Sequence, residues 1–406
     1  MLGLRRNVVS VSLTSILVGL AGSLFGTVFN LYLWDLNFTL LDISVLNVIP
    51  ASISLLSARF FGKWADTSGR KKFVVVGMLF ATAAYTLFFL MIRSNTVNYL
   101  YLVFIFLIMG LGGSINSGAL LAVATTMVER NKSGTSFGTY LSANAVGWTL
   151  GSFFSGMIAD RYGMDLLLLS TTLIYVIGLI VFSLGFVEES VQRRRVPLKS
   201  LLRSSWSLSI EGNTEALALI YIITAIFALG SSIYYLAFSI KIYILFGSKT
   251  LYGYIMGIAG ISNIVSPYIA GRIADKTSKE RLLLGGMLTR DIYMAYLSVS
   301  WNKAATIIFM ITPFWVLIYV PMVAMTTDYS ARGHESEIQS LRGIIANASN
   351  MLGSLLAGII ARIYDVRHNI RSIDIILMIG TIIYFLAAIP ALKLNRNFGS
   401  IMTISP

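Results

Sequence analysis

The chain has 406 residues, of which 56% are hydrophobic and only 12% are charged, and it carries a net charge of +13. A water-soluble domain of this size cannot bury so much apolar surface, so the composition excludes an ordinary soluble protein and places the chain in a lipid bilayer. The sequence contains no cysteine, which excludes disulfides, thiolate chemistry and cysteine-based metal sites.

Apolar windows dominate the sequence. Cutting it at charges and turn residues leaves about twelve of them, each long enough for a helix that crosses a hydrocarbon layer of ~30 Å. Runs of this length exclude a β-barrel, whose strands are short and alternate apolar with polar residues. The first window lacks a small-residue cleavage pattern, so we interpret it as a span rather than a signal peptide. The expected spans are 9–34, 43–62, 73–92, 99–127, 136–158, 166–187, 216–240, 251–270, 282–300, 304–326, 338–361 and 373–393.

The positive charge is distributed as a topology signal. If the N-terminus is cytoplasmic, 22 of the 31 cations fall on cytoplasmic segments, 8 fall outside, and Arg290 lies within a span. Because cytoplasmic loops carry an excess of Lys and Arg, we predict that both termini are cytoplasmic. The same distribution argues against nucleic acid as a partner.

A motif occurs twice, 209 positions apart. Segments 62–72 and 271–281 both contain Gly-x-x-x-Asp-x-x-x-cation, as Gly62, Asp66 and Arg70 and again as Gly271, Asp275 and Lys279. A repeat of this length, with about six spans in each copy, is the layout of a secondary transporter whose halves move around a central site. The longest polar interval separates the copies. We therefore predict an N-terminal six-helix bundle (1–190), a cytoplasmic linker (191–215) and a C-terminal six-helix bundle (216–406).

These features resemble the major facilitator superfamily. The resemblance covers the whole chain and includes the loop signature Gly62-x-x-x-Asp66-x-x-Gly69-Arg70-Lys71-Lys72 between the second and third spans. It implies an all-α polytopic membrane protein with twelve transmembrane helices in two pseudo-symmetric six-helix bundles, which works by alternating access.

The resemblance also implies a cytoplasmic latch that favours the outward-facing form. An Asp in such a loop can sit at the positive N-terminus of another helix, and the resemblance puts Asp66 near the start of the eleventh span and Asp275 near the start of the fifth. Three of the members have an alternative role as solvated loop charges: Glu129, Arg130 and Arg332. The latch residues are Gly62, Asp66, Gly69, Arg70, Gly271, Asp275, Lys279, Glu129, Arg130 and Arg332.

Two departures argue against a proton-coupled drug antiporter of this superfamily. Such antiporters carry an arginine in the fourth span, where this chain has Phe106, and a Gly-Pro pair in the fifth, where it has Gly151 and Ser152.

Asp291 is the one acid of eighteen that falls near the middle of a span, beside Arg290. Ionisable groups at this depth are costly, so Asp291, with Arg290, is our coupling candidate as a proton carrier. The alternative is a structural ion pair or a polar link to a neighbouring helix. Both histidines, His334 and His368, fall in loops.

Polar and aromatic residues at mid-depth are candidates for binding a substrate. Each has a structural alternative, because asparagines often bond between helices and aromatics often pack. Together they suit a neutral or amphipathic solute. The candidates are Asn116, Asn144, Tyr234, Tyr235, Asn263, Trp315, Tyr319, Asn347 and Asn350.

We therefore expect a transporter in the cell membrane that moves a small organic solute by alternating access, with the proton as a candidate coupling ion. An uncoupled facilitator and a non-transporting scaffold or sensor of the same fold are the alternatives. An enzyme is disfavoured, and no cofactor or metal is expected, because no cluster of His, Cys or paired carboxylates lies in a span. Membrane lipids are the other expected partners, and we expect a monomer.

The latch generates a prediction. We expect Asp66→Asn to shift the resting population toward the inward-facing form, because an amide cannot replace the charge at the helix N-terminus. Single cysteines placed on each side of this cysteine-free chain would report the shift by their labelling rates. Unchanged labelling on both sides would contradict the latch.

Overall fold

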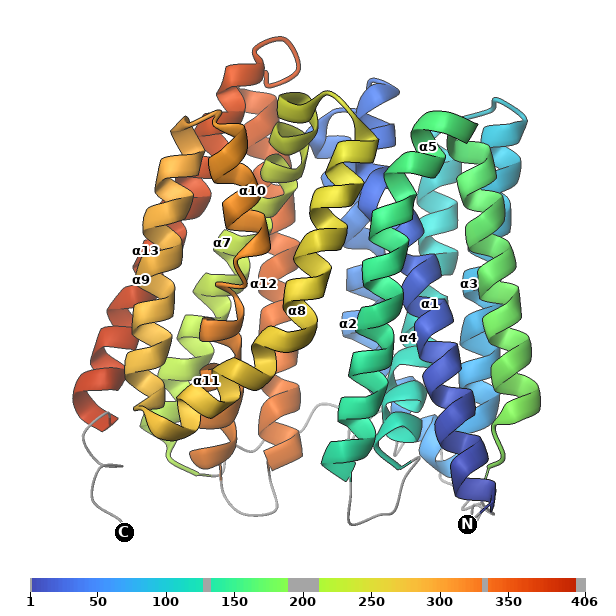
Figure 1. The fold of residues 1–406 in the computed structure, drawn as a ribbon, viewed down its shortest axis with the longest axis horizontal. Helices are drawn as coiled ribbons and strands as arrows, with labels where there is room; N and C mark the ends of the chain where they lie inside the picture. The colour runs from blue at the N-terminus through green and yellow to red at the C-terminus, as the bar shows by residue number, and fades with distance from the viewer. Residues whose placement is uncertain (1, 127–132, 189–211, 331–334, 399–406) are drawn as a thin grey trace. The chain divides into compact units, whose positions relative to one another are not determined.

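The computed structural model describes residues 2–126, 133–188, 212–330 and 335–398. These residues are nearly all helical, and no strand occurs among them (Figure 1). The fold class predicted from the sequence, an all-α membrane protein, is therefore confirmed.

Five helices make up the first half of the chain. They are α1 (Leu2–Asp35), α2 (Leu40–Ser68), α3 (Arg70–Arg93), α4 (Tyr99–Thr126) and α5 (Ser133–Gly185). The last of these has two arms that meet at Gly163, where φ is +88° and the backbone is not helical. Glycine tolerates this conformation because it lacks a Cβ atom. The chain reverses there (Figure 1), so the expected spans 136–158 and 166–187 are the two arms of α5.

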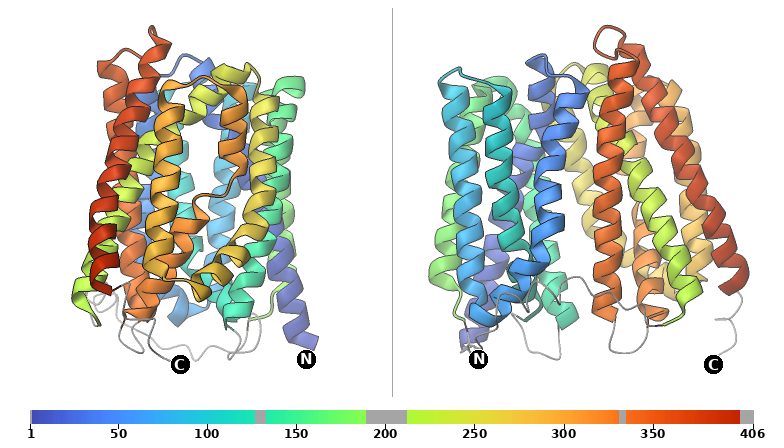
Figure 2. Two further views of the ribbon diagram at one scale, coloured as in Figure 1. Left: turned by 60° about the vertical axis from the view of Figure 1, so that its left-hand side comes forward. Right: turned by 180° about the vertical axis from the view of Figure 1, so that it is seen from behind.

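The second half contains one interrupted helix. Its elements are α7 (Thr214–Phe246), α8 (Lys249–Lys276), α9 (Lys279–Val299), α10 (Lys303–Ile311), α11 (Val316–Asp328), α12 (Glu335–Ile363), η2 (Ile370–Ser372) and α13 (Ile373–Phe398). The expected span 304–326 lies within the apolar segment Lys303–Asp328, which is long enough to cross a membrane, but its helix is interrupted: it ends at Ile311 and resumes at Val316 (Figure 2). Pro313 explains the break: it has no N–H to donate, and it disfavours helical backbone at Thr312, whose ψ is 118°.

Nine helical segments among the described residues are long and apolar enough to cross a membrane. One of them, Thr139–Gly185, has 47 residues. A straight helix of that length would span about 70 Å, more than twice the hydrocarbon thickness of ~30 Å, so its two arms fit two crossings. The helix α9, which carries Arg290 and Asp291, is not among the nine, and the total of twelve crossings stays a prediction.

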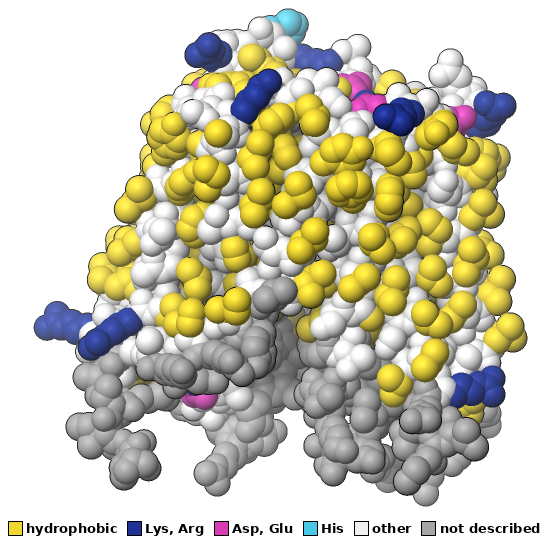
Figure 3. Space-filling model, viewed as in Figure 1, with side chains coloured by type: hydrophobic (Ala, Val, Ile, Leu, Met, Phe, Trp, Pro, Cys, Tyr) yellow, Lys and Arg dark blue, Asp and Glu magenta, His cyan; other side chains and the backbone are white. Residues whose placement is uncertain are grey.

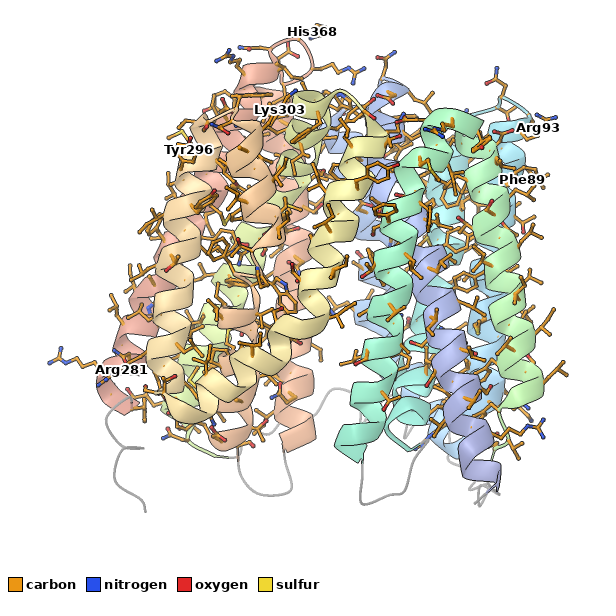
Figure 4. All side chains as sticks on the ribbon, in the orientation of Figure 1. Phe89, Arg93, Arg281, Tyr296, Lys303 and His368 are labelled. Carbon is orange, nitrogen blue, oxygen red and sulfur yellow. The ribbon has the colours of Figure 1, made fainter. Side chains whose placement is uncertain are left out.

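The surface agrees with a membrane setting. On the face shown in Figure 3, hydrophobic side chains cover the middle of the helices, and the charged side chains gather near their ends. In the C-terminal part of the chain, Lys303 and His368 lie at one end of the helices and Arg281 lies at the other (Figure 4).

The described residues form two compact units. The core of the second contains apolar side chains of α7, α9, α11 and α13, such as Ile223, Met287 and Met325. The first unit falls within Met1–Tyr32, Leu46–Ser207 and Ser248–Ile261, and the second within Leu33–Val45, Leu208–Gly247 and Ser262–Pro406. The predicted bundle boundaries at 190 and 216 stay a prediction.

Within the first unit, Asp160 of α5 caps the start of α8. Its Oδ2 accepts hydrogen bonds from the backbone N–H of Thr250 (2.8 Å), the Thr250 hydroxyl (2.8 Å) and the Ser248 hydroxyl (3.1 Å). A carboxylate satisfies the N–H groups that a helix leaves unpaired at its N-terminus, and its charge suits the helix dipole there.

Glycines permit close helix packing in the first unit. A Cβ atom at Gly147 of α5 would overlap the carbonyl oxygen of Ile16 and lie 2.8 Å from the backbone nitrogen of Leu20, both on α1. A Cβ atom at Gly22 of α1, in contrast, would meet nothing within 4 Å. The α1–α5 contact therefore depends on the missing side chain at position 147.

This contrast predicts opposite effects for one substitution at two sites. We expect Gly147→Ala to lower stability by about 1–3 kcal/mol, the usual cost of overpacking. The matched control Gly22→Ala should be neutral or stabilising by up to about 1 kcal/mol, because alanine favours a helix. Thermal unfolding of the purified proteins in detergent measures both. Equal stabilities would refute the close approach.

Candidate functional site

Arg290 of α9 reaches into the second unit between α7 and α13. Its side chain is 2% exposed, and its Nη2 donates hydrogen bonds to the hydroxyls of Tyr235 (3.0 Å) and Tyr384 (2.9 Å). The guanidinium carbon lies 4.7 Å from the ring centre of Tyr384 and 4.9 Å from that of Phe227. Aromatic faces stabilise a cation in a dry environment, so this buried charge is held by rings.

Part of the Arg290 guanidinium is left without a partner. Its Nε and Nη1 are buried, and neither makes a hydrogen bond with the described part of the chain. A buried donor without an acceptor costs about 1–3 kcal/mol, more when the group is charged. The cluster therefore leaves two hydrogen-bond donors of Arg290 unsatisfied.

Asp291, the coupling candidate, is also buried, and one of its carboxylate oxygens lacks a hydrogen-bond donor within the described part of the chain. It is 1% exposed, and its Oδ2 has no hydrogen-bond partner among the described residues. Consecutive side chains on a helix point in different directions, so Asp291 does not face the Arg290 guanidinium. No ion pair within 4.0 Å joins the two. The alternative of a structural ion pair is therefore not supported by a close Arg290–Asp291 contact, Oδ2 makes no polar link to a neighbouring helix among the described residues, and the coupling role stays a prediction.

Lys241 is a buried cation that the sequence analysis missed, because the expected span ended one residue before it. The ammonium, 2% exposed, donates to the carbonyls of Leu297 (2.9 Å) and Ser298 (3.1 Å) and to Oδ1 of Asp374 (2.6 Å). Trp301 packs over it and donates its Nε1 to Oδ2 of the same Asp374 (3.1 Å). All three ammonium hydrogens donate to acceptors on α9 and α13, so Lys241 has a structural role and links α7 to these two helices. The sequence signal was a lone lysine near the end of an apolar run.

Three of the predicted binding residues come together beside the break between α10 and α11. Trp315 donates its Nε1 to Oδ1 of Asn263 on α8 (2.7 Å), and its ring lies 5.8 Å from that of Tyr319. The guanidinium of Arg342 on α12, a residue that the sequence analysis did not propose, stacks 5.2 Å from the Tyr319 ring. Trp315 is 36% exposed and Tyr319 is 45% exposed, so this cluster presents polar and aromatic groups at a surface.

The other predicted binding residues lie elsewhere. Tyr234 is fully buried and donates to the carbonyl of Met294 (3.5 Å), while Asn144 donates to the carbonyl of Ser15 (3.3 Å). Asn116 packs against Gly77 of α3, and its buried Oδ1 has no hydrogen-bond partner in the ranges that the structure describes. Asn347 and Asn350 are exposed on α12. Tyr235, in contrast, belongs to the Arg290 cluster.

The latch is described only in part. Among its predicted members, Arg70 begins α3, and Gly69 precedes it with φ of +106°. Glu188, which the sequence analysis did not propose, accepts hydrogen bonds from the backbone N–H groups of Arg70 and Lys71 and so caps α3. Outside the described residues or side chains lie Gly62, Asp66, Glu129, Arg130, Gly271, Asp275 and Arg332.

Lys279 joins the start of α9 to the end of α11. Its ammonium pairs with Oδ2 of Asp328 at 2.5 Å. Next to it, the hydroxyl of Tyr329 donates to Oε1 of the buried Glu280 (2.8 Å). Burial, together with this carboxylate, raises the pKa of Tyr329, so the hydroxyl remains a donor at neutral pH. The predicted role of Lys279 in the latch itself is untested.

Phe106, which stands where drug antiporters carry an arginine, is part of an apolar core. It is buried, and its ring lies 5.6 Å from that of Phe88 and 6.0 Å from that of Phe29. The position is therefore filled by aromatic packing between α1, α3 and α4.

Comparison with known proteins agrees with this architecture. The sequence matches the family model of the Major Facilitator Superfamily over residues 11–314 and again over 220–398. The chain belongs to the Major Facilitator Superfamily. It is therefore a multi-pass membrane transport protein and not an enzyme.

Other superfamily members are similar over most of their length. The multidrug resistance protein MdtG of Salmonella arizonae is 25% identical over 317 residues, which cover 74% of this chain and 75% of MdtG. MdtG of Salmonella heidelberg is 24% identical over 383 residues, 89% of this chain and 90% of that protein. Among solved structures, the nucleoside transporter NupG has a TM-score of 0.77 at 11% identity and covers 96% of this chain and 99% of its own. A bacterial homologue of the human lysosomal transporter Spinster has a TM-score of 0.75 at 11% identity, with 97% of both chains covered.

The buried Lys241–Asp374 pair predicts that replacing Lys241 costs much more folding stability than replacing the exposed Lys393. We expect Lys241→Met to cost roughly 3–5 kcal/mol, because it leaves Asp374 without its cation. Lys393→Met should cost less than about 1 kcal/mol, because the Lys393–Glu215 pair is exposed. Thermal unfolding in detergent compares the two variants, and a similar loss of stability in both would show that Lys241 does not link the three helices.

Proposed function

We propose that the protein is a secondary active transporter that carries a small amphipathic organic solute across the cell membrane by alternating access, coupled to protons. The observation that carries this proposal is the interrupted helix between α10 and α11, flanked by the partly exposed cluster of Asn263, Trp315 and Tyr319. Both termini would be cytoplasmic.

Irregular backbone has a special meaning inside a membrane. It is tolerated only where it is buried in protein or lines a water-filled cavity, and discontinuous helices form the substrate sites of many transporters. Residues 312–315 form such a segment, and the indole of Trp315 and the ring of Tyr319 are partly exposed beside it. These groups support a transport site at this break.

The chemistry of the cluster suits an amphipathic solute. Indole and phenol rings offer apolar area with one polar edge, and the Asn263 amide adds a hydrogen-bonding group. Similarity to proteins named for multidrug resistance supports a small organic compound as the cargo. Phe106 and Ser152 argue that any coupling residue differs from the one that the drug antiporters use.

Asp291 is the residue that we propose for coupling. A carboxylate in the membrane interior without a hydrogen-bonded cation is costly, so the neutral form is favoured while Asp291 is buried. A conformational change that exposes this side chain to water would favour release of the proton. Solute movement and proton movement would then share one conformational cycle.

This role predicts a separation of two transport modes. In liposomes with an imposed pH gradient, Asp291→Asn should lose gradient-driven accumulation while keeping counterflow, because an amide cannot carry the proton but leaves the solute site intact. A panel of a labelled lipophilic cation, a nucleoside and an aromatic carboxylate supplies the solutes. Asp365→Asn, at an exposed loop position, is the matched control.

The outcomes discriminate among the functions. If the Asp291→Asn variant accumulates solute as well as the wild-type protein does, Asp291 is not the coupling residue. Counterflow by the wild-type protein without any effect of the pH gradient would favour an uncoupled facilitator. The absence of flux for every solute on the panel would favour a scaffold or sensor and would contradict the proposal.

A further inference from the structure

The hydrogen bonds around Arg290 have a fixed direction. A guanidinium has five N–H groups and no acceptor, so the hydroxyls of Tyr235 and Tyr384 must both accept from it. Each hydroxyl therefore keeps its own hydrogen for another partner. Tyr384 shares a hydrogen bond with the hydroxyl of Ser231, which can take that hydrogen.

Tyr235 is different, because its hydroxyl makes no second hydrogen bond with the described chain. The residue is 38% exposed, whereas Tyr384 is fully buried. Its hydrogen bond with Arg290 is only partly buried, so the O–H hydrogen lies near a surface, and the Arg290 cation polarises the hydroxyl. Such a donor favours an acceptor that carries negative charge.

The charge balance points the same way. Arg290 forms no ion pair within 4.0 Å in the described part of the chain, and its Nε and Nη1 are buried without partners. The three rings around it lower the cost of burying the cation but do not neutralise it. Lys241, in the same three-helix seam, shows the complete arrangement, with a carboxylate and two carbonyls on one ammonium. The Arg290 guanidinium has no carboxylate in contact with it among the described residues: the neighbouring Asp291 interacts with it electrostatically but forms no ion pair within 4.0 Å.

We propose that Tyr235 and Arg290 bind the carboxylate of an amphipathic, singly charged organic solute. The Tyr235 hydroxyl donates to one carboxylate oxygen at the surface, and the Arg290 charge behind it compensates the negative charge. This deepens the proposed transport function by naming the class of cargo. A single site cation matches one carboxylate and leaves the apolar body to aromatic groups.

Two probes of the same shape test the charge. We would measure the binding of 1-naphthoate and of its uncharged analogue 1-naphthamide to the purified protein in detergent, by intrinsic fluorescence and by thermal stabilisation. We expect the wild-type protein to prefer naphthoate by about tenfold or more, as hydrogen bonds to a charged group allow. Equal binding of both probes, preference for the amide, or no naphthoate binding up to its solubility limit would overturn the proposal.

Two tyrosine variants test the site. Tyr235→Phe keeps the ring and removes the donor, so it should lose most of the preference for naphthoate, while binding of naphthamide stays the same. Tyr293→Phe is the matched control, because the Tyr293 hydroxyl donates to the carbonyl of Ala305 and lies outside the cluster. Unfolding temperature and elution profile confirm that each variant is folded. An unchanged naphthoate preference in Tyr235→Phe would assign the anion to another site.

This experiment needs no gradient and no flux, so its failure is distinct from failure of the transport proposal. Naphthoate binding that depends on Tyr235, in a protein that moves no solute, would support the site and refute the transport function. Gradient-driven flux restricted to neutral or cationic solutes would support transport and overturn the carboxylate site.

Discussion

Hydrocarbon offers no hydrogen-bond partner, and this constraint governs the whole structure. Every backbone group and every buried charge must find its partner within the protein or in a cavity. The long helices meet the demand for the backbone, which is why a sequence with 56% hydrophobic residues forms little else. The exceptions to this rule are few among the described residues, and they are the informative places.

Lys241 and Arg290 show the two ways in which a buried cation is accommodated. Both are almost fully buried between α7, α9 and α13. The ammonium of Lys241 uses every hydrogen on carbonyls and a carboxylate, so it ties the ends of these helices together. The guanidinium of Arg290 has two N–H donors without a partner among the described residues, and it polarises the hydroxyl of the partly exposed Tyr235. Completeness of partners separates the structural cation from the one that we propose to be functional.

Helix ends show the same constraint at the edges of the membrane. Glu188 caps α3 and Asp160 caps α8, and in each case a carboxylate from α5 or the residues that follow it meets the free N–H groups of another helix. The break at 312–315 places helix ends inside a span instead. There the backbone groups pair locally, as in the hydrogen bond from the N–H of Val316 to the carbonyl of Pro313, and we propose that the partly exposed indole of Trp315 beside them contacts the solute.

The sequence by itself determined the fold class, most span positions, the repeat and the isolation of Asp291. Hydropathy and the positions of charges are properties of consecutive residues, so they can be read without knowing how the helices pack. It also identified the Asn263, Trp315 and Tyr319 candidates by depth alone. Only the tertiary structure decided which candidates meet. It placed Tyr234 and Asn144 in helix packing, joined Tyr235 to Arg290, and supplied Tyr384, Lys241 and Glu188 as partners. The physical reason is that a side chain's partners come from other helices far along the chain, and helix rotation and packing set those contacts, which no local pattern encodes.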